Sequence, residues 1–274
     1  MLDAFAAATQ ALLYTGVLCA SGAVFAASTL KPLEGVLRSL ASVMRLGAIA
    51  TILATALSTA ILILRLGTDV DAAIVSAVLT TNVGAAAALR IGGAMLLLIL
   101  PAAHDDSFGR GMHLSAAVLI VASFAYSGHA ATQGIGAGVI AALHVAIAAW
   151  WAGSLMAMVR ADEDVVRLVR RFSSLAVWLV AGLFVAGVVL IFVLLDFSSF
   201  SITPYIRNLS IKIAVALSVF AIAAYNKFAL TDRVLAEDAA ALLSLRRAIH
   251  IEIVLIAAVL VATAILTTYS SPFD

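Results

Sequence analysis

Long apolar segments separated by short polar ones run through the whole chain. A helix needs roughly 20 apolar residues to cross a membrane. Eight segments meet this length, at approximately residues 5–30, 42–66, 83–103, 112–131, 135–159, 172–196, 205–230 and 247–269. Residues 70–82 are too short and too polar to cross, and we expect a helix that lies at the membrane interface. The pattern predicts an all-α polytopic membrane protein, a bundle of eight transmembrane helices.

The composition supports a membrane environment. Hydrophobic residues make up 64% and charged residues 11% of the chain, whereas roughly a quarter of a soluble domain is charged. A net charge of +1 gives no reason to expect nucleic-acid binding, and a single cysteine, Cys19, excludes an intramolecular disulfide. No hydrolytic, phosphate-binding or HExxH motif occurs, so we expect no enzyme. We expect one membrane domain over residues 1–274, whose first apolar segment is a span and not a signal peptide.

The basic residues predict the orientation of the bundle. Twelve of the sixteen fall in the loops or helix ends of one side: Lys31, Arg38, Arg45, Arg110, Arg160, Arg167, Arg170, Arg171, Lys227, Arg233, Arg246 and Arg247. Short loops rich in Lys and Arg stay in the cytoplasm. We therefore expect both termini to face outward, which is the periplasm in a bacterium.

The hairpin of residues 126–155 holds the first candidate site. Two apolar helices flank a Gly-rich turn at 132–138, with His129 before the turn and His144 in the second helix. Ionisable side chains at membrane depth are functional candidates by default. We expect His144 about six residues, or roughly 10 Å, inside its helix, and the two histidines to differ in depth by roughly 6 Å. Imidazole binds copper, zinc, iron and nickel, so the spacing leaves the metal open.

Sulfur and indole groups suggest a route inward from this hairpin. Trp151 and Met158 follow His144 at helical spacing, although packing alone also explains Met158. Cys19 and Met95, near the middle of other predicted spans, are candidate soft ligands. Cys19 lies in a small-residue stretch, which favours helix packing as its role.

Two further charged residues fall inside predicted spans. Lys212 either extends to the outer surface or lines a polar cavity, and it shares one helix face with Tyr205 and Asn208. Glu252 requires a cation at the inner side, for which Lys227 or Arg171 is the expected partner.

Five segments of the second half follow one another in a defined order. They are SGHAA (127–131), LHVAIAAWWAGSL (143–155), RFSSLAVWLVAGLFVAGV (171–188), YIRNLSIKIAVALSVFAIAAYNKFAL (205–230) and LRRAIHIEIVLIAAVLVATAIL (245–266). Together they resemble the CopD family of copper-resistance proteins of the bacterial inner membrane. The resemblance defines a core of about residues 112–269, whereas residues 1–111 are less typical. Ser154 stands where the family pattern has a glycine.

This resemblance implies copper handling, usually import across the inner membrane from the periplasm to the cytoplasm, often beside a periplasmic copper donor of the CopC type. It implies that His129 and His144 bind the copper ion. Lys212, Asn226 and Glu252 match family positions without a defined role. We therefore expect a multi-pass copper transporter of the bacterial inner membrane, in contact with the lipid bilayer. The sequence does not indicate an oligomeric state.

A haem-binding redox protein is the alternative function. His129 and His144 would then ligate haem b near the outer surface, and an inner site would use His104, His113 and His250. For these three we favour simple contact with water at the helix ends. A third alternative is a metal-independent assembly or resistance factor whose histidines only form hydrogen bonds between helices.

Overall fold

The computed structural model describes residues 1–66, 71–101, 107–161, 164–195 and 203–270. Eight helical segments of this described part are long and apolar enough to cross a membrane, as predicted. Six are α1 (Leu2–Leu30), α2 (Glu34–Leu66), α4 (Asn82–Ile99), α7 (Ile135–Val159), α8 (Val165–Leu194) and α11 (Ala239–Tyr269). The other two are composite: α5 (Ser107–Ala122) with the 3-10 helix η1 (Ser123–Tyr126), and α9 (Pro204–Tyr225) with the π-helix η3 (Asn226–Leu230) and α10 (Thr231–Leu235).

Two short helices complete the described fold. α3 (Ala72–Leu79) lies where the sequence predicts an interfacial helix. Asp71 begins α3, because its side chain accepts a hydrogen bond from the Ile74 backbone N–H. α6 (His129–Thr132) is a single turn between η1 and α7. The Gly-rich turn is shorter than predicted, since α7 begins at Ile135 and only two residues separate it from α6.

Three long helices begin seven or eight residues before the positions that hydropathy predicts. α2, α8 and α11 start at residues 34, 165 and 239, not at 42, 172 and 247. The added turns contain arginines, which lower hydropathy although arginine favours a helix. These helices therefore continue past the apolar layer, and their basic ends extend beyond it.

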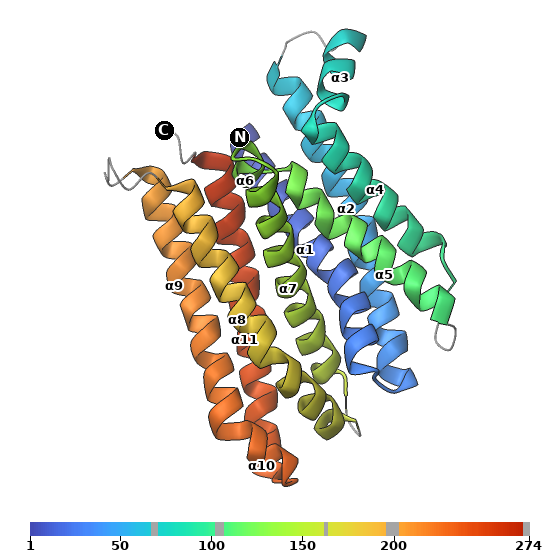
Figure 1. The fold of residues 1–274 in the computed structure, drawn as a ribbon, viewed down its shortest axis with the longest axis vertical. Helices are drawn as coiled ribbons and strands as arrows, with labels where there is room; N and C mark the ends of the chain where they lie inside the picture. The colour runs from blue at the N-terminus through green and yellow to red at the C-terminus, as the bar shows by residue number, and fades with distance from the viewer. Residues whose placement is uncertain (67–70, 102–106, 162–163, 196–202, 271–274) are drawn as a thin grey trace.

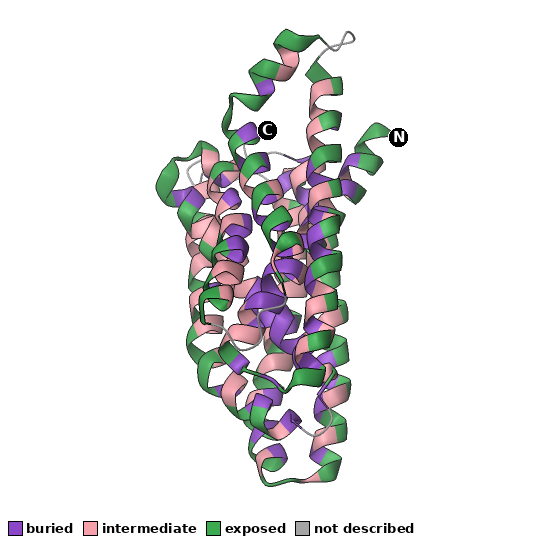
Figure 2. Ribbon diagram, turned by 90° about the vertical axis from the view of Figure 1, so that its right-hand side faces the viewer, coloured by how far each residue is buried: buried purple, intermediate pink, exposed green. Residues whose placement is uncertain are grey.

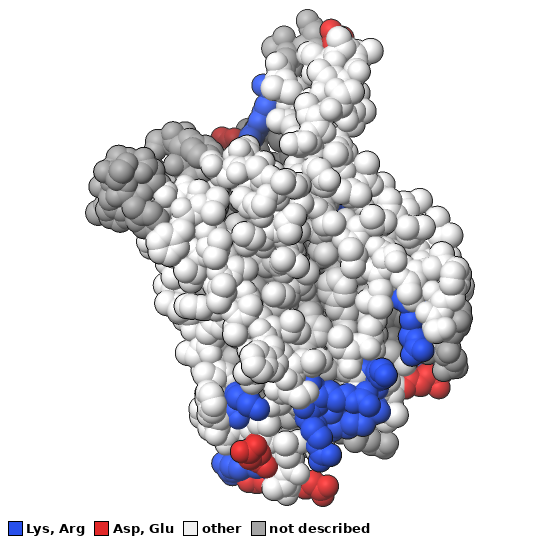
Figure 3. Space-filling view, viewed as in Figure 1, with Lys and Arg blue, Asp and Glu red and all other residues white. Residues whose placement is uncertain are grey.

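The two ends of the bundle differ in charge. Both termini and α6 lie at one end, and α10 lies at the other (Figure 1). Figure 3 shows that the Lys and Arg side chains visible on this face gather mainly around the α10 end. The basic residues of the sequence are thus concentrated at the end opposite the termini.

Helix α1 packs closely against α2 and α7 through glycines. A Cβ at Gly47 of α2 would lie 2.5 Å from the Ala20 backbone nitrogen and 2.8 Å from Cβ of Cys19. On the α7 side, a Cβ at Gly153 would lie 2.0 Å from the Gly22 carbonyl oxygen. Lipid tails provide no hydrophobic force between helices, so close backbone approach at small residues holds such bundles together. Cys19 lies at this contact between α1 and α2, where a packing role is expected.

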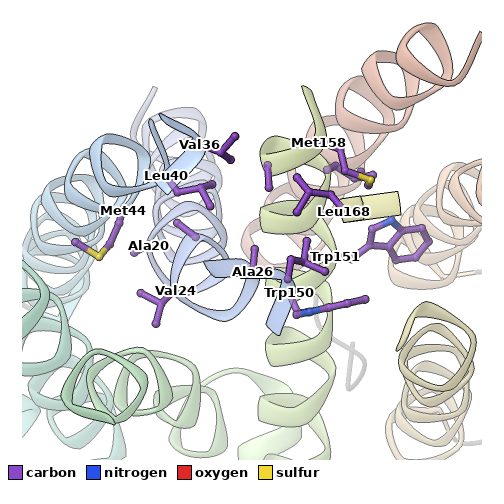
Figure 4. Close-up of a cluster of buried hydrophobic side chains, with 14 of the residues drawn as sticks. Ala20, Val24, Ala26, Val36, Leu40, Met44, Trp150, Trp151, Met158 and Leu168 are labelled. Atoms are coloured by element: carbon purple, nitrogen blue, oxygen red, sulfur yellow. The ribbon is translucent and has the colours of Figure 1, made fainter. Parts of the chain in front are cut away.

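The buried side chains form a core between α1, α2, α7 and α8 (Figures 2 and 4). Trp150 stacks on Phe172 of α8, with ring centroids 5.3 Å apart, and its indole N–H donates to Thr29 Oγ1 at 2.9 Å. Met158 lies in the same core, close to Leu168 (Figure 4). This environment favours the packing role of Met158 over a place on a metal pathway.

Asp164 joins the start of α8 to the α1–α2 turn at the basic end. Its carboxylate accepts two hydrogen bonds from the Arg167 guanidinium, the longer of which is 2.7 Å. It also accepts one from the Leu33 backbone N–H at 3.0 Å. Nearby, Arg171 donates to the Leu30 carbonyl oxygen at 2.7 Å. These bonds cross-link two loops that are far apart in sequence.

The bond from Arg167 holds the pKa of the Asp164 carboxyl below its ordinary value of 3.8. A carboxylate with a lowered pKa in the folded state stabilises the fold fully at pH values above its ordinary pKa. This stabilisation is lost as the pH falls through the pKa of the folded state. Asp164→Asn is therefore expected to lower the free energy of unfolding by about 1 kcal/mol at pH 7, because Arg167 is partly solvated. Thermal unfolding in detergent at pH 7 and at decreasing pH measures the difference.

The exposed Asp232 of α10 provides the control, since Asp232→Asn is expected to leave the melting temperature unchanged. The difference in melting temperature between wild type and Asp164→Asn narrows below pH 3.8 if the ion pair stabilises the fold. A gap that stays constant with pH would contradict this role.

Candidate metal site

His129 is placed at the terminus end of the bundle by the single turn of α6. Gly128 precedes it with φ 79°, a conformation that glycine adopts without strain. The imidazole is half-buried and lies edge-on to the ring of Tyr205 on α9, with centroids 6.3 Å apart. The outer histidine is thus positioned against the start of α9.

His144 lies in α7 and faces α8. A Cβ at Gly187 of α8 would approach its Cε1 at 3.4 Å and its Nδ1 at 3.8 Å, so the glycine brings the α8 backbone up to the ring. The backbone at Leu183 approaches the imidazole closely enough to act on it as a weak hydrogen-bonding group, although no hydrogen bond of normal geometry forms. Its Nδ1 is buried and has no hydrogen-bond partner in the described part of the chain. A buried nitrogen without a partner is costly, which makes this atom a candidate ligand.

Helix α9 relates the two histidines in depth. Tyr205 lies beside His129, and Lys212, seven residues further along α9, lies within electrostatic range of His144. Seven residues of helix correspond to roughly 10 Å. His144 is nine residues after the first residue of α7, or roughly 13 Å. His144 therefore lies deeper in its helix than the roughly 10 Å that the sequence predicts, because residues 135–138 of the expected turn are helical.

The face of α9 that carries Lys212 points into the bundle. Tyr205, on this face, is buried, and Asn208 donates to Ser270 Oγ of α11 at 2.9 Å. Lys212 itself forms no hydrogen bond or ion pair with the residues that the structure describes. Lys212 is thus half-buried on the face of α9 that also carries Tyr205 and Asn208.

Arg90 of α4 anchors the segment that precedes His129, a role that the sequence analysis missed. It is 8% exposed, donates from Nε to Ser123 Oγ at 2.8 Å and also donates to Ser127 Oγ. Its guanidinium lies over the Phe124 ring, 4.8 Å from the centroid. The signal in the sequence is an arginine inside an apolar span. Arg90 fixes η1, and with it the approach to the outer histidine.

A second polar group, which we call the inner cluster, consists of Trp151, Asn226 and Glu252. The Trp151 indole N–H donates to Glu252 Oε2 at 3.3 Å, and the Asn226 amide donates to Glu252 Oε1. The three residues come from α7, η3 and α11. Trp151, predicted to line a pathway, is therefore part of a buried hydrogen-bonded group. The ring of Trp151 also lies 5.6 Å from that of Phe220 on α9.

The cations predicted for Glu252 are bound elsewhere, and that prediction is wrong. Lys227 donates to Ser173 Oγ, and Arg171 donates to the Leu30 carbonyl oxygen. Lys227 thus reaches α8, and Arg171 reaches the end of α1 next to the α1–α2 turn, so neither side chain extends to Glu252. Glu252 takes part in no ion pair among the described residues.

The other candidate ligands lie away from the histidines. Met95 is 43% exposed on α4, and Cys19 packs on α2. His113 and His250 each bond through Nδ1 to a backbone carbonyl one turn earlier, at 2.8 and 2.7 Å, and His250 is exposed. His113 lies near the start of α5, as expected for water contact at a helix end, whereas His250 lies eleven residues into α11. His104 lies outside the described residues. Within the described residues, no group of three or more His, Cys, Asp or Glu side chains is arranged to hold a metal.

Comparisons with known proteins identify the family. A family model described as copper resistance protein D matches residues 166–266. A second, described as the copper resistance protein D-like N-terminal domain, matches residues 1–139. No curated protein and no solved structure matches the chain, and no comparison supports the haem alternative. The two matches cover both halves of the eight-helix bundle, and the chain belongs to the CopD family of copper resistance proteins.

Proposed function

We propose that this protein carries copper across the bacterial inner membrane, from the periplasm to the cytoplasm. The observation that carries the proposal is the buried Nδ1 of His144, which has no hydrogen-bond partner at the contact between α7 and α8. Copper is the transported ion, and it binds first to His129 and then to His144. An imidazole nitrogen binds copper well, and a site with few ligands releases its ion more readily than a closed cage.

The charge distribution supports the orientation. The end around α10 carries most of the Lys and Arg side chains visible in Figure 3, and Lys- and Arg-rich loops remain in the cytoplasm. The termini and α6 then face the periplasm, and His129 is the first ligand that an incoming ion meets. A CopC-like protein is the proposed copper donor at this end.

Lys212 suits a transfer site better than a storage site. Its positive charge acts on His144 from α9 and opposes a cation bound there. A cation near a like charge is held less firmly and leaves sooner. We propose that Lys212 lowers the affinity at His144 enough for the ion to continue inward.

Copper uptake by the purified protein in liposomes tests the function, with Cu(I) and Cu(II) offered separately and zinc as the comparison ion. We expect copper accumulation, measured by metal analysis of the washed vesicles, to exceed that in protein-free vesicles. Equal accumulation with and without the protein, for both copper ions, would exclude transport. A haem absorption band in the same sample would favour the redox alternative.

His129→Ala is expected to lower the initial rate of copper uptake by on the order of tenfold, the cost of weakening one metal contact. The His129→Ala variant is expected to keep the copper bound at His144, because the two histidines lie at different depths. The matched control is Gln133→Ala, an exposed residue one turn further along at the same end. Equal uptake by His129→Ala and the control would remove His129 from the route.

A further inference from the structure

Glu252 is a buried carboxylate in the middle of α11. It is 2% exposed and lies thirteen residues after the first residue of a 31-residue helix. Its two oxygens accept one hydrogen bond each, from Trp151 and from Asn226. An ionised carboxylate at this depth is costly unless a positive charge compensates it. The structure therefore requires a partner for Glu252 that the described side chains do not supply.

The ligand chemistry at Glu252 favours a proton over a metal ion. A metal in a protein site takes several donors, and no second carboxylate, histidine or cysteine joins Glu252 in the described residues. Trp151 brings only an N–H donor, which repels a cation. A proton needs no ligand beyond one carboxylate oxygen. The inner cluster is thus suited to bind hydrogen ions.

Asn226 can serve both states of the carboxyl group. Its Nδ2 donates to the carboxylate, while its Oδ1 is buried without a hydrogen-bond partner. If the side-chain amide of Asn226 turned over, its oxygen and nitrogen would exchange places, and Oδ1 would accept a hydrogen bond from the O–H of a protonated Glu252. Asn226 is 8% exposed and begins the π-helix η3. Single π-turns within a helix occur frequently at functional sites.

We propose that Glu252 is a proton-exchange site that couples copper movement to a proton. The carboxylate takes one proton from water on one side of the membrane and becomes a neutral acid. It later returns this proton to water and regains its charge, and no other bond forms or breaks. The coupling rests on the proposed copper transport, whereas proton binding at Glu252 does not.

The neighbouring charged and titratable groups are directed to other partners. Those on α11, η3 and α8 near the inner end bind backbone or hydroxyl oxygens: His250 to Arg246, Arg246 to Ala161, Lys227 to Ser173 and Arg171 to Leu30. On α10, Asp232 is exposed, and Arg233 pairs with Asp238. On α7 and α9, His144 lies seven residues before Trp151, and Lys212 lies fourteen residues before Asn226. On α1, Tyr14 bonds to Thr267, near the other end of α11, and Cys19 packs on α2.

Infrared difference spectra of the protein in liposomes, recorded between acidic and alkaline pH, test proton binding directly. We expect a carbonyl stretch of a protonated carboxylic acid that is lost at alkaline pH in the wild type and is absent in Glu252→Gln. Asn226→Ala is expected to shift this band, because it removes one hydrogen bond from the group. The control is Glu34→Gln, which changes an exposed glutamate paired with Arg38 and keeps the band.

Copper uptake with a pH-sensitive dye inside the vesicles tests the coupling. In the wild type we expect a pH change that depends on copper, and in Glu252→Gln we expect copper flux without this pH change. The same infrared band in Glu252→Gln, or an unchanged proton flux, would overturn the proposal. If wild-type vesicles take up no copper, the transport function fails, and the infrared band still decides whether Glu252 binds a proton.

Discussion

His144→Ala is expected to abolish copper binding at the membrane-buried site while the bundle stays folded. The imidazole is the proposed ligand at this depth, and its Nδ1 has no hydrogen-bond partner among the described residues to compete with the metal. Loss of outer-shell groups alone costs roughly 10–100-fold in metal affinity, so loss of the ligand itself exceeds that range. The fold loses little, because hydrogen bonds between membrane helices average about 0.6 kcal/mol.

Metal analysis of the purified variant and its elution from a sizing column measure both effects. The matched control is His250→Ala, since His250 is exposed at the basic end and bonds only one turn back along α11. Copper content is expected to remain at the wild-type level in the control. If His144→Ala retained the same copper as His250→Ala, His144 would not be a ligand, and the transport proposal would lose its main support.

Gly153→Leu is expected to prevent normal assembly of the bundle. A Cβ at Gly153 would lie 2.0 Å from the Gly22 carbonyl oxygen and 2.2 Å from its carbonyl carbon, both of which are backbone atoms. Backbone cannot rotate away as a side chain can, so α1 and α7 must separate. Overpacking of this kind costs about 3 kcal/mol or more.

Yield of monodisperse protein and melting temperature in detergent measure this effect. Gly92→Leu is the control, because a Cβ at Gly92 meets no atom within 4 Å although this glycine also lies in a membrane-spanning helix. The control separates the steric effect from the general consequence of replacing a glycine in a helix. A melting temperature for Gly153→Leu equal to that of Gly92→Leu would contradict the close contact between α1 and α7.

The eight spans could be predicted from the sequence, because a membrane imposes a minimum apolar length on each crossing. Their ends could not. The apolar pattern stops where arginines begin, but α2 and α8 continue through those residues into the aqueous phase. Hydropathy measures transfer into lipid, whereas the backbone of a helix continues as long as its hydrogen bonds do. The shortened turn before Ile135 has the same origin, since helical glycines resemble a loop in the sequence.

The candidate site could be predicted only in part. The two histidines stood out because imidazole is rare at membrane depth, yet the groups around them come from distant segments. Gly187 and Arg90 shape the surroundings of His144 and His129 from other helices, and no local pattern links them. The inner cluster was missed for the same reason. Trp151 resembles a packing residue until the structure brings Glu252 of α11 to its indole nitrogen.

The helices on the two sides of His144 differ greatly in how firmly they are held. In the most apolar 18-residue window of α1, 56% of residues are buried, compared with 6% in α8. Displacement of α1 would break close backbone contacts, whereas α8 has its buried residues mainly near its basic end, at Val165, Leu168, Val169 and Ser173. A rearrangement that exposes the ion first to one compartment and then to the other is therefore expected to rock α8 against a stationary α1–α7 pair. His144, on the stationary side, would keep its position while the wall opposite it opens and closes.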